Sequence, residues 1–265
     1  MKFVVKSVLI VVLLFVGVAI WYAWKWQSLF ISAKPRPAYS VNGHGSDTLL
    51  IALIGDSWAG LHSTSRPDSA VSAEWTALLG RPVRYVSCGK GGANSGDIYR
   101  LMFHQGLSID SFSSMSLLQQ RPEYAVVSAG INDANQNLGV KTYCANYHLI
   151  VRHLLRCGIR PVILEVPDVD LKHVYGNKSL KERTADAYKA FLAGTGLYNV
   201  AEYRQGLRQY LEDNMLMDSV IYIDCQSWNP TGYRDSALYL QDCIHLNRQG
   251  YAKLDSCIIS VIKSE

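Results

Sequence analysis

The chain has few charged residues and none of the patterns that mark a nucleic-acid-binding protein. Of its 265 residues, 18% are charged, and its lysines and arginines form neither a dense patch nor a run interleaved with aromatic residues. The formal net charge of +4 includes Lys2, Lys6 and Lys25 around the N-terminal apolar segment, so the rest of the chain is close to neutral. This balance excludes binding driven by phosphate neutralisation. Internal repeats and low-complexity tracts are also absent.

Residue patterns for metal and nucleotide binding are missing as well. No Cys-x-x-Cys pair and no cluster of histidine and cysteine has the spacing of a zinc site, so we expect no metal. The glycine-rich stretch GKGGANSG, residues 89–96, lacks the spacing and the Gly-Lys-Ser/Thr ending of a phosphate-binding loop. We therefore expect no cofactor, metal or organic.

The N-terminus contains one long hydrophobic run. Between Lys6 and Lys25 lie 18 uncharged residues, close to the ~20 that cross a bilayer as a helix. Aromatic residues cluster at its far end and lysines precede it, which favours a cytoplasmic N-terminus and a body outside the cytoplasm, in a bacterial periplasm or at the cell surface. We predict a membrane anchor over residues 1–26. A cleaved signal peptide is the alternative, because Gly17 and Ala19 are small residues that suit a cleavage site, and it would give a secreted protein.

The residues after the anchor divide into a linker and one domain. Residues 27–46 include a stretch rich in proline, glycine and small polar residues, which is typical of a linker. Residues 47–265 alternate short apolar runs with helical patterns. The predicted strands are 49–54, 82–86, 124–129, 161–166 and 220–224, and the predicted helices are 69–79, 95–104, 140–157, 180–216 in pieces, and 247–263. This alternation predicts an α/β fold of three α/β/α layers around a mostly parallel five-stranded sheet.

Polar motifs follow the predicted strands at the edge where such sheets bind ligands. Ser57 lies in GDSW after the first strand, where its hydroxyl and backbone N–H suit attack on a carbonyl. A glycine-rich loop containing Gly92 follows the second strand, and Asn132 in GIND follows the third. Asp242 precedes His245 by three residues, so its carboxylate can orient the imidazole. Each motif alone also fits an ordinary turn or helix cap.

Together the four motifs resemble those of the GDSL or SGNH hydrolase family, over residues 49–263. The resemblance implies a flavodoxin-like fold with Ser57 as nucleophile, His245 as base and Asp242 as its orienting acid. It also implies an oxyanion hole formed by the N–H groups of Ser57 and Gly92 and the amide of Asn132. Trp58 departs from the family pattern, because leucine usually follows the serine.

The implied activity is serine-dependent hydrolysis of acyl esters. We expect a small acyl group, acetyl above others, on a carbohydrate outside the cytoplasm. Trp58, Tyr99, Trp228 and Tyr233 lie in or near predicted loops, where they could stack on sugars. A lysophospholipase-like or lipase-like activity, a catalytically idle domain that binds a glycan or a partner, and acyl transfer to another acceptor are the alternatives. The sequence does not give the oligomeric state.

Two further questions stay open at this stage. The six cysteines permit disulfides in an exported domain, and Cys88 and Cys243 lie inside the motifs, but buried free thiols are equally compatible with the sequence. Residues 168–218 are long for a connection between strands. They are expected either to cover the site as a lid or to pack on the sheet as extra helices.

Overall fold

The domain is built on five parallel strands. The computed structural model describes residues 2–41, 47–104 and 113–265. The strands are β1 (Leu49–Gly55), β2 (Val83–Gly89), β3 (Tyr124–Ser128), β4 (Arg160–Leu164) and β5 (Ile221–Ile223), in the order β2-β1-β3-β4-β5. All neighbouring pairs in this sheet are parallel. Each strand begins within two residues of its predicted first residue. The α/β fold with a parallel five-stranded sheet is confirmed.

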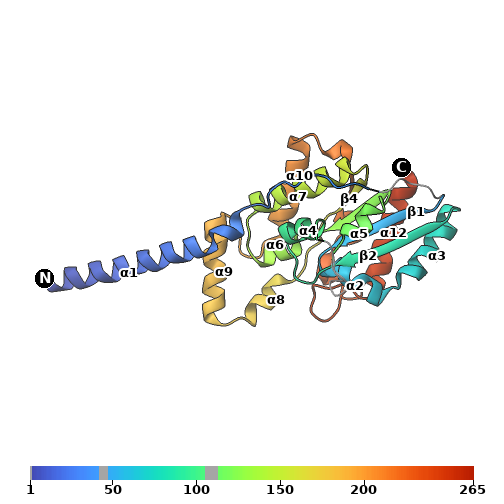
Figure 1. Cartoon of the computed structure of the whole chain (residues 1–265). Helices are drawn as coiled ribbons and strands as arrows, with labels where there is room; N and C mark the ends of the chain where they lie inside the picture. The colour runs from blue at the N-terminus through green and yellow to red at the C-terminus, as the bar shows by residue number, and fades with distance from the viewer. Residues whose placement is uncertain (1, 42–46, 105–112) are drawn as a thin grey trace.

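Helices cover both faces of the sheet and give the predicted three layers (Figure 1). The twelve α-helices of the described residues are α1 (Lys2–Trp26), α2 (Ser57–Ser65), α3 (Asp68–Leu79), α4 (Ser95–Leu101), α5 (Met115–Gln119), α6 (Ile131–Asn135), α7 (Val140–Arg156), α8 (Leu171–Gly176), α9 (Leu180–Ala193), α10 (Val200–Asp213), α11 (Cys225–Trp228) and α12 (Arg248–Ser264). Helices α2, α3 and α12 pack together on one face, whereas α4 and α7 cover the other and α10 packs on α7. Strand β1 is buried along its whole length because both of its faces are covered.

The strand order reverses direction beside β1, and this places the site. The chain leaves β1 toward β2 and then crosses back to β3 on the other side. At the carboxyl ends, Gly55 of β1 is level with Gly89 of β2 and Ser128 of β3. The loops after these three strands therefore meet at a topological switch point, where open α/β sheets bind their ligands.

Helix α1 extends away from the domain. Lys6–Trp26 forms 21 residues with a mean hydropathy of 2.4, long and apolar enough to cross a membrane. Figure 1 shows α4 and α6, which follow β2 and β3, on the side of the sheet from which α1 extends. The carboxyl edge of the sheet thus faces the same side of the molecule as α1.

The segment after α1 runs along the surface of the domain. Residues 31–41 contain no helix or strand, but the backbone N–H of Ala33 donates to Asn146 Oδ1 (2.7 Å) and that of Arg36 donates to the Tyr99 hydroxyl (2.9 Å). The Tyr39 ring packs edge-on against His153. The first part of the predicted linker is thus bound to the domain, and residues 42–46 lie outside the described residues.

Residues 168–218 form three helices. Helix α10 buries Tyr203, Leu207 and Leu211, and it packs on α7. Among the described residues of this segment, none lines the cavity beside Ser57. Helix α10 thus packs on another helix, and the described part of the segment does not cover the cavity in this structure.

Candidate active site

Ser57 is held at the sheet edge by the start of a helix. It is the first residue of α2, directly after β1, and the side chain of Asp56 caps the helix by accepting from the Trp58 N–H (3.0 Å). The first N–H groups of a helix have no partner within it. The Ser57 N–H therefore points out of the helix and is available to an anion, which the helix dipole also favours.

Close backbone packing fixes the position of α2. A Cβ built on Gly60 of α2 would lie 2.8 Å from the carbonyl oxygen of Gly89, and one on Gly89 would lie 2.4 Å from that of Asp56. A Cβ on Gly55 would lie 2.1 Å from the Ser128 carbonyl oxygen. These contacts are shorter than any side chain tolerates, so glycine is required where β1, β2 and α2 meet.

His245 and Asp242 reach Ser57 from the loop before α12. His245 Nε2 lies 2.9 Å from Ser57 Oγ, and His245 Nδ1 lies 2.6 Å from Asp242 Oδ2. The other carboxylate oxygen accepts the N–H groups of Ile244 and His245, at 2.9 Å each. The sequence prediction that these three side chains come together is matched by their positions.

The electrostatics of Asp242 favour its charged form. Partial burial alone would raise the pKa of this carboxyl, but hydrogen bonds from the His245 backbone and side chain and from the Ile244 N–H outweigh it and lower the pKa. A carboxylate that stays ionised keeps a proton on His245 Nδ1. It thereby leaves Nε2 free to accept the serine proton.

Trp58 secures the histidine loop. Its side chain is 1% exposed, its Nε1–H donates to the Ile244 carbonyl oxygen (3.0 Å), and its backbone oxygen accepts from the Tyr251 hydroxyl (3.0 Å). The residue after the nucleophile is thus tied to both the histidine loop and α12. Sequence reasoning gave Trp58 a part in sugar stacking and missed this bracing contact.

Gly92 and Asn132 lie in the wall of the cavity beside His245. Gly92 has φ +75°, and no acceptor for its N–H is found among the described residues. The side chain of Asn132 donates one of its two protons to the Ala93 carbonyl oxygen (3.0 Å), which leaves the other for a ligand. Both residues line a cavity of about 430 Å³ with Ser57 and His245.

Gln136 holds the Gly92 loop, and nothing in the sequence reasoning singled it out. Its amide nitrogen donates to the Gly92 carbonyl oxygen (3.1 Å), and its amide oxygen accepts from Asn94 (2.9 Å). Asn94 in turn caps α4 in a reciprocal pair with Asp97. Gln136, itself held by Asn94, thus fixes the peptide that follows Gly92, next to the one that carries the Gly92 N–H. The only sequence signal for Gln136 is its position four residues after Asn132.

Two buried carboxyl groups, Asp56 and Asp133, hydrogen-bond the segments that carry the site. Burial raises the pKa of Asp56 to about 6, and burial raises that of Asp133 to about 7. Asp133 accepts from the N–H (2.9 Å) and hydroxyl (2.5 Å) of Ser95, and so joins α6 to α4. It does not contact His245, so Asp242 is the carboxylate that orients the imidazole in this geometry.

The proposed sugar-stacking aromatics are mostly inside the protein. Trp58, Tyr99 and Trp228 are at most 2% exposed and belong to the core, and only Tyr233 keeps a partly exposed ring. The cavity wall is instead aliphatic, with Leu61, Ile131 and Ile244. Predicting three of these four as platforms was wrong, because Trp58, Tyr99 and Trp228 lie in helices and turn their rings into the core.

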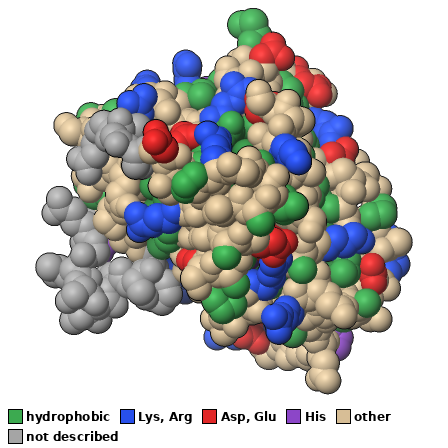
Figure 2. Space-filling model, turned by 90° about the vertical axis from the view of Figure 1, so that its right-hand side faces the viewer, with side chains coloured by type: hydrophobic (Ala, Val, Ile, Leu, Met, Phe, Trp, Pro, Cys, Tyr) green, Lys and Arg blue, Asp and Glu red, His purple; other side chains and the backbone are tan. Residues whose placement is uncertain are grey.

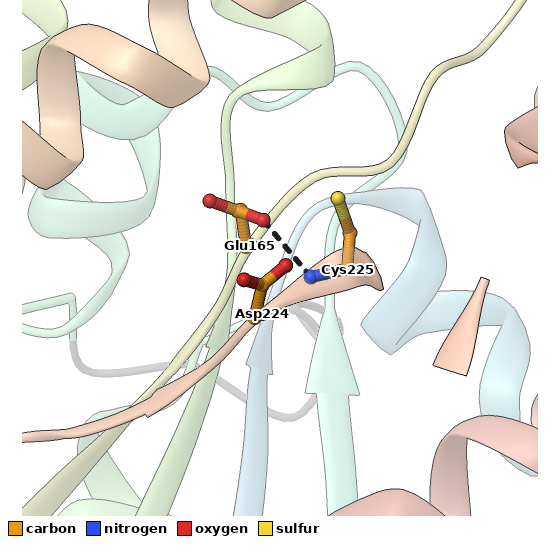
Figure 3. A group of neighbouring side chains, drawn as sticks. All are labelled: Glu165, Asp224 and Cys225. Atoms are coloured by element: carbon orange, nitrogen blue, oxygen red, sulfur yellow. Dashed lines mark hydrogen bonds between the residues drawn. The ribbon is translucent and has the colours of Figure 1, made fainter. Parts of the chain in front are cut away.

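One group of potential metal ligands exists among the described residues. Glu165, Asp224 and Cys225 bring ligand atoms within 4.8 Å of one another at the ends of β4 and β5 (Figure 3). Arg208 donates to both carboxylates, at 3.1 Å to Glu165 and 2.9 Å to Asp224, and the Cys225 N–H donates to Glu165 (2.9 Å). The guanidinium already supplies the positive charge that a cation would bring. Burial also raises the pKa of Cys225 to about 12, so we propose no metal here.

All six cysteines are free thiols. The disulfide suggested for Cys88 or Cys243 is therefore not formed in this structure. The histidine loop is braced instead by the Leu240 N–H, which donates to the His245 carbonyl oxygen (2.8 Å), and by the Trp58 contact above.

The fold and this arrangement of serine, histidine and aspartate define a class of α/β hydrolytic enzymes. The family model of the GDSL-like Lipase/Acylhydrolase family matches residues 53–253. The chain belongs to this family, and it is a carboxylic ester hydrolase by class. No curated protein matches the chain.

Solved structures share the fold at low sequence identity. The lipase/acylhydrolase from Enterococcus faecalis has 17% identity and a TM-score of 0.55, with 81% of this chain and 95% of that one covered. The psychrotrophic esterase EstA from Pseudoalteromonas sp. has 14% identity and a TM-score of 0.54, with 82% and 97% covered. An acetylxylan esterase from Geobacillus stearothermophilus has 14% identity and a TM-score of 0.54, with 80% and 93% covered.

Proposed function

We propose that the chain hydrolyses short acyl esters with Ser57 as nucleophile, His245 as general base and Asp242 as the orienting acid. The observation that carries this proposal is the chain of contacts at 2.9 Å and 2.6 Å that links the three side chains at the wall of a cavity. His245 takes the serine proton as Oγ attacks the ester carbonyl, and it returns that proton to the leaving alcohol. Water, activated by the same imidazole, then releases the acid from the acyl-enzyme.

The oxyanion would be bound by the Ser57 and Gly92 N–H groups and the free amide proton of Asn132. These donors come from the ends of three different strands, so the sheet fixes their relative positions before substrate arrives. Such preorganised donors stabilise the charge that develops on the carbonyl oxygen.

We further propose an acetyl or similar small acyl group on a carbohydrate as the substrate. The modest cavity volume and its short aliphatic wall support a small acyl group, and the acetylxylan esterases among the structural neighbours support a carbohydrate. The burial of the expected aromatic platforms leaves polar loop groups to bind the sugar.

A series of p-nitrophenyl esters, from acetate to octanoate, tests the preferred acyl length and the role of Ser57 on the purified full-length chain. We expect kcat/KM to be highest with acetate and to fall with chain length, and Ser57→Ala to abolish turnover and labelling by a serine-directed phosphonate. A preference for octanoate would replace the carbohydrate esterase with a lipase-like enzyme. Well-folded wild-type protein that neither turns over nor is labelled would indicate an idle binding domain.

We also propose that α1 is an uncleaved membrane anchor and that the domain lies outside the cytoplasm. Its length, its hydropathy and the lack of any buried residue in its apolar window support this placement. The intact mass of protein extracted from membranes should include residues 1–26, and alkaline carbonate washing should not release it. A mature chain that begins after Ala19 and washes off would identify a signal peptide instead.

A further inference from the structure

Helix α9 turns an acidic residue, Asp186, toward the domain. Asp186 is 6% exposed and Ala190 is 3% exposed, and these residues, four apart, mark the face that packs inward. Asp186 accepts from Lys178 Nζ (2.9 Å) and from the Tyr198 hydroxyl (2.5 Å). A surface helix of a water-soluble domain normally has the opposite arrangement, with its apolar stripe inside.

The opposite face of α9 carries large apolar side chains. Leu180, Thr184, Tyr188 and Phe191 follow one another at spacings of four, four and three, so they lie on one side of the helix. Leu180 and Phe191 are each 78% exposed, and the Tyr188 and Phe191 rings are stacked with centroids 6.4 Å apart. These two ends of the helix expose apolar surface that the domain does not cover.

This face is joined to helix α1. The Tyr188 hydroxyl donates to the Ala19 carbonyl oxygen (2.9 Å), and its ring lies 6.0 Å from that of Trp26. Lys189 lies over the same Trp26 ring, 5.3 Å from its centroid. The contact is therefore at the aromatic end of α1, the end expected at a membrane–water interface.

The corner between the two helices is an apolar groove. It has a volume of about 590 Å³ and is lined by Phe15, Val18 and Tyr22 of α1 and by Leu180 and Thr184 of α9, among others. The apolar surface of α1 thus continues onto α9, where Lys181 and Thr184 are the polar residues of the lining. A lipid chain beside α1 would contact both helices.

The direction of α9 fits a membrane surface. Figure 1 shows α9 crossing the end of α1, so a bilayer that contained α1 would have α9 lying along its surface. Figure 2 views the molecule from its other end, away from α1, and there basic and acidic side chains are interspersed and apolar groups are scattered. The two ends of the molecule differ as a membrane-facing and a water-facing end would.

We propose that α9 is an interfacial helix, whose Leu180–Phe191 face lies in the acyl-chain boundary of the bilayer that α1 crosses. This proposal rests on the membrane anchor proposed above. Lipid acyl chains would cover the apolar face that the domain leaves uncovered. Interfacial helices bury such a face ~5–10 Å into the boundary between headgroups and acyl chains. The catalytic domain then has two attachments to the membrane, which fix its orientation.

Quenching by phospholipids brominated near the headgroup end of the acyl chains tests the proposal with the full-length chain in vesicles. A tryptophan is added on α9 as Phe191→Trp or Leu180→Trp, and Leu78→Trp on α3 is the control, since Leu78 is also half-exposed at 49%. The domain's own Trp58, Trp75 and Trp228 are at most 2% exposed, so quenching of the unmodified chain reports on the tryptophans of α1. We expect each α9 tryptophan to lose about half its emission or more, and Leu78→Trp to lose almost none.

The outcomes separate the two proposals. In one outcome, brominated lipid quenches the unmodified chain, but the tryptophans added on α9 are quenched no more than the one added at Leu78. This result would overturn the interfacial helix and leave the anchor intact. Quenching at one end of α9 alone would show that the helix does not lie in the membrane plane and would also overturn the proposal. An unmodified chain that brominated lipid does not quench would overturn the anchor, and the interfacial helix with it.

Discussion

The two oxygens of Asp242 have different partners, and this allows a precise substitution. Asp242→Asn can keep its oxygen on the N–H groups of Ile244 and His245, which places the amide nitrogen opposite His245 Nδ1. The amide nitrogen is a donor, so His245 Nδ1 must accept from it and the imidazole proton moves to Nε2. A protonated Nε2 can no longer accept the proton of Ser57. We expect kcat to fall by up to ~10⁴ with an unchanged thermal unfolding midpoint. Retained activity would mean that another carboxylate orients the imidazole.

Asp56 makes a prediction about pH and stability. Its Oδ1 accepts from the Trp58 N–H and the Ser128 hydroxyl, whereas its buried Oδ2 has no partner, as suits a protonated carboxyl. The folded pKa of about 6 lies above the ordinary value of 3.8, so this group's stabilising contribution is complete below pH 3.8 and is lost as the pH rises through 6. The Asp56→Asn variant would have no such loss, because an amide does not titrate.

Urea unfolding of the wild type and of Asp56→Asn at pH 4 and pH 8 measures this effect. Between these pH values the free energy of unfolding of Asp56→Asn should gain on that of the wild type by about 2 kcal/mol, most of the equivalent of the pKa shift, because pH 4 lies just above the ordinary pKa. A difference that does not change with pH would show that Asp56 is ionised throughout.

At the scale of elements, the glycine contacts between β2 and α2 give a paired test. Gly89→Ala would place a Cβ against the Asp56 carbonyl oxygen and the Gly60 nitrogen, so α2 and Ser57 must shift. We expect a loss of about 1–3 kcal/mol in the free energy of unfolding, together with reduced activity. Gly91→Ala, two residues on, has nothing within 4 Å of the new Cβ and should change stability by less than about 1 kcal/mol. Equal effects in a chemical denaturation series would contradict this packing.

The strands and the four motifs could be predicted because their signals are local. Apolar runs such as LLIALI are buried on both faces, and GDSW, GIND and the Asp242–His245 spacing each belong to one turn. The burial of Trp58 and Trp228 could not be predicted, because their rings come from opposite ends of the domain sequence to pack against each other (centroids 6.1 Å apart). The role of Gln136 was hidden for the same reason, since its partners Gly92 and Asn94 come from another loop.

At the scale of the whole molecule, the apolar face of α9 has meaning only together with α1. The amphipathic pattern of residues 180–193 predicts a helix correctly but does not say which face turns inward. The partners of Asp186 decide that question, because a buried carboxylate needs partners. Asp186 finds them at Lys178 and Tyr198, outside α9, and at Lys189 of α9 itself. Charge pairing thus sets the orientation of the helix, and its apolar side is left to face outward.

The bound course of residues 31–41 has a consequence for how the enzyme would meet its substrate. A flexible tether would let the domain move and rotate freely relative to its anchor. A segment hydrogen-bonded to Asn146 and Tyr99 does not allow this motion. An anchored chain would carry its cavity at a constant height, on the edge of the sheet that faces the side of α1. Its turnover would then depend on the number of esters per unit area within one layer of the envelope, and diluting the surrounding medium would leave that number unchanged.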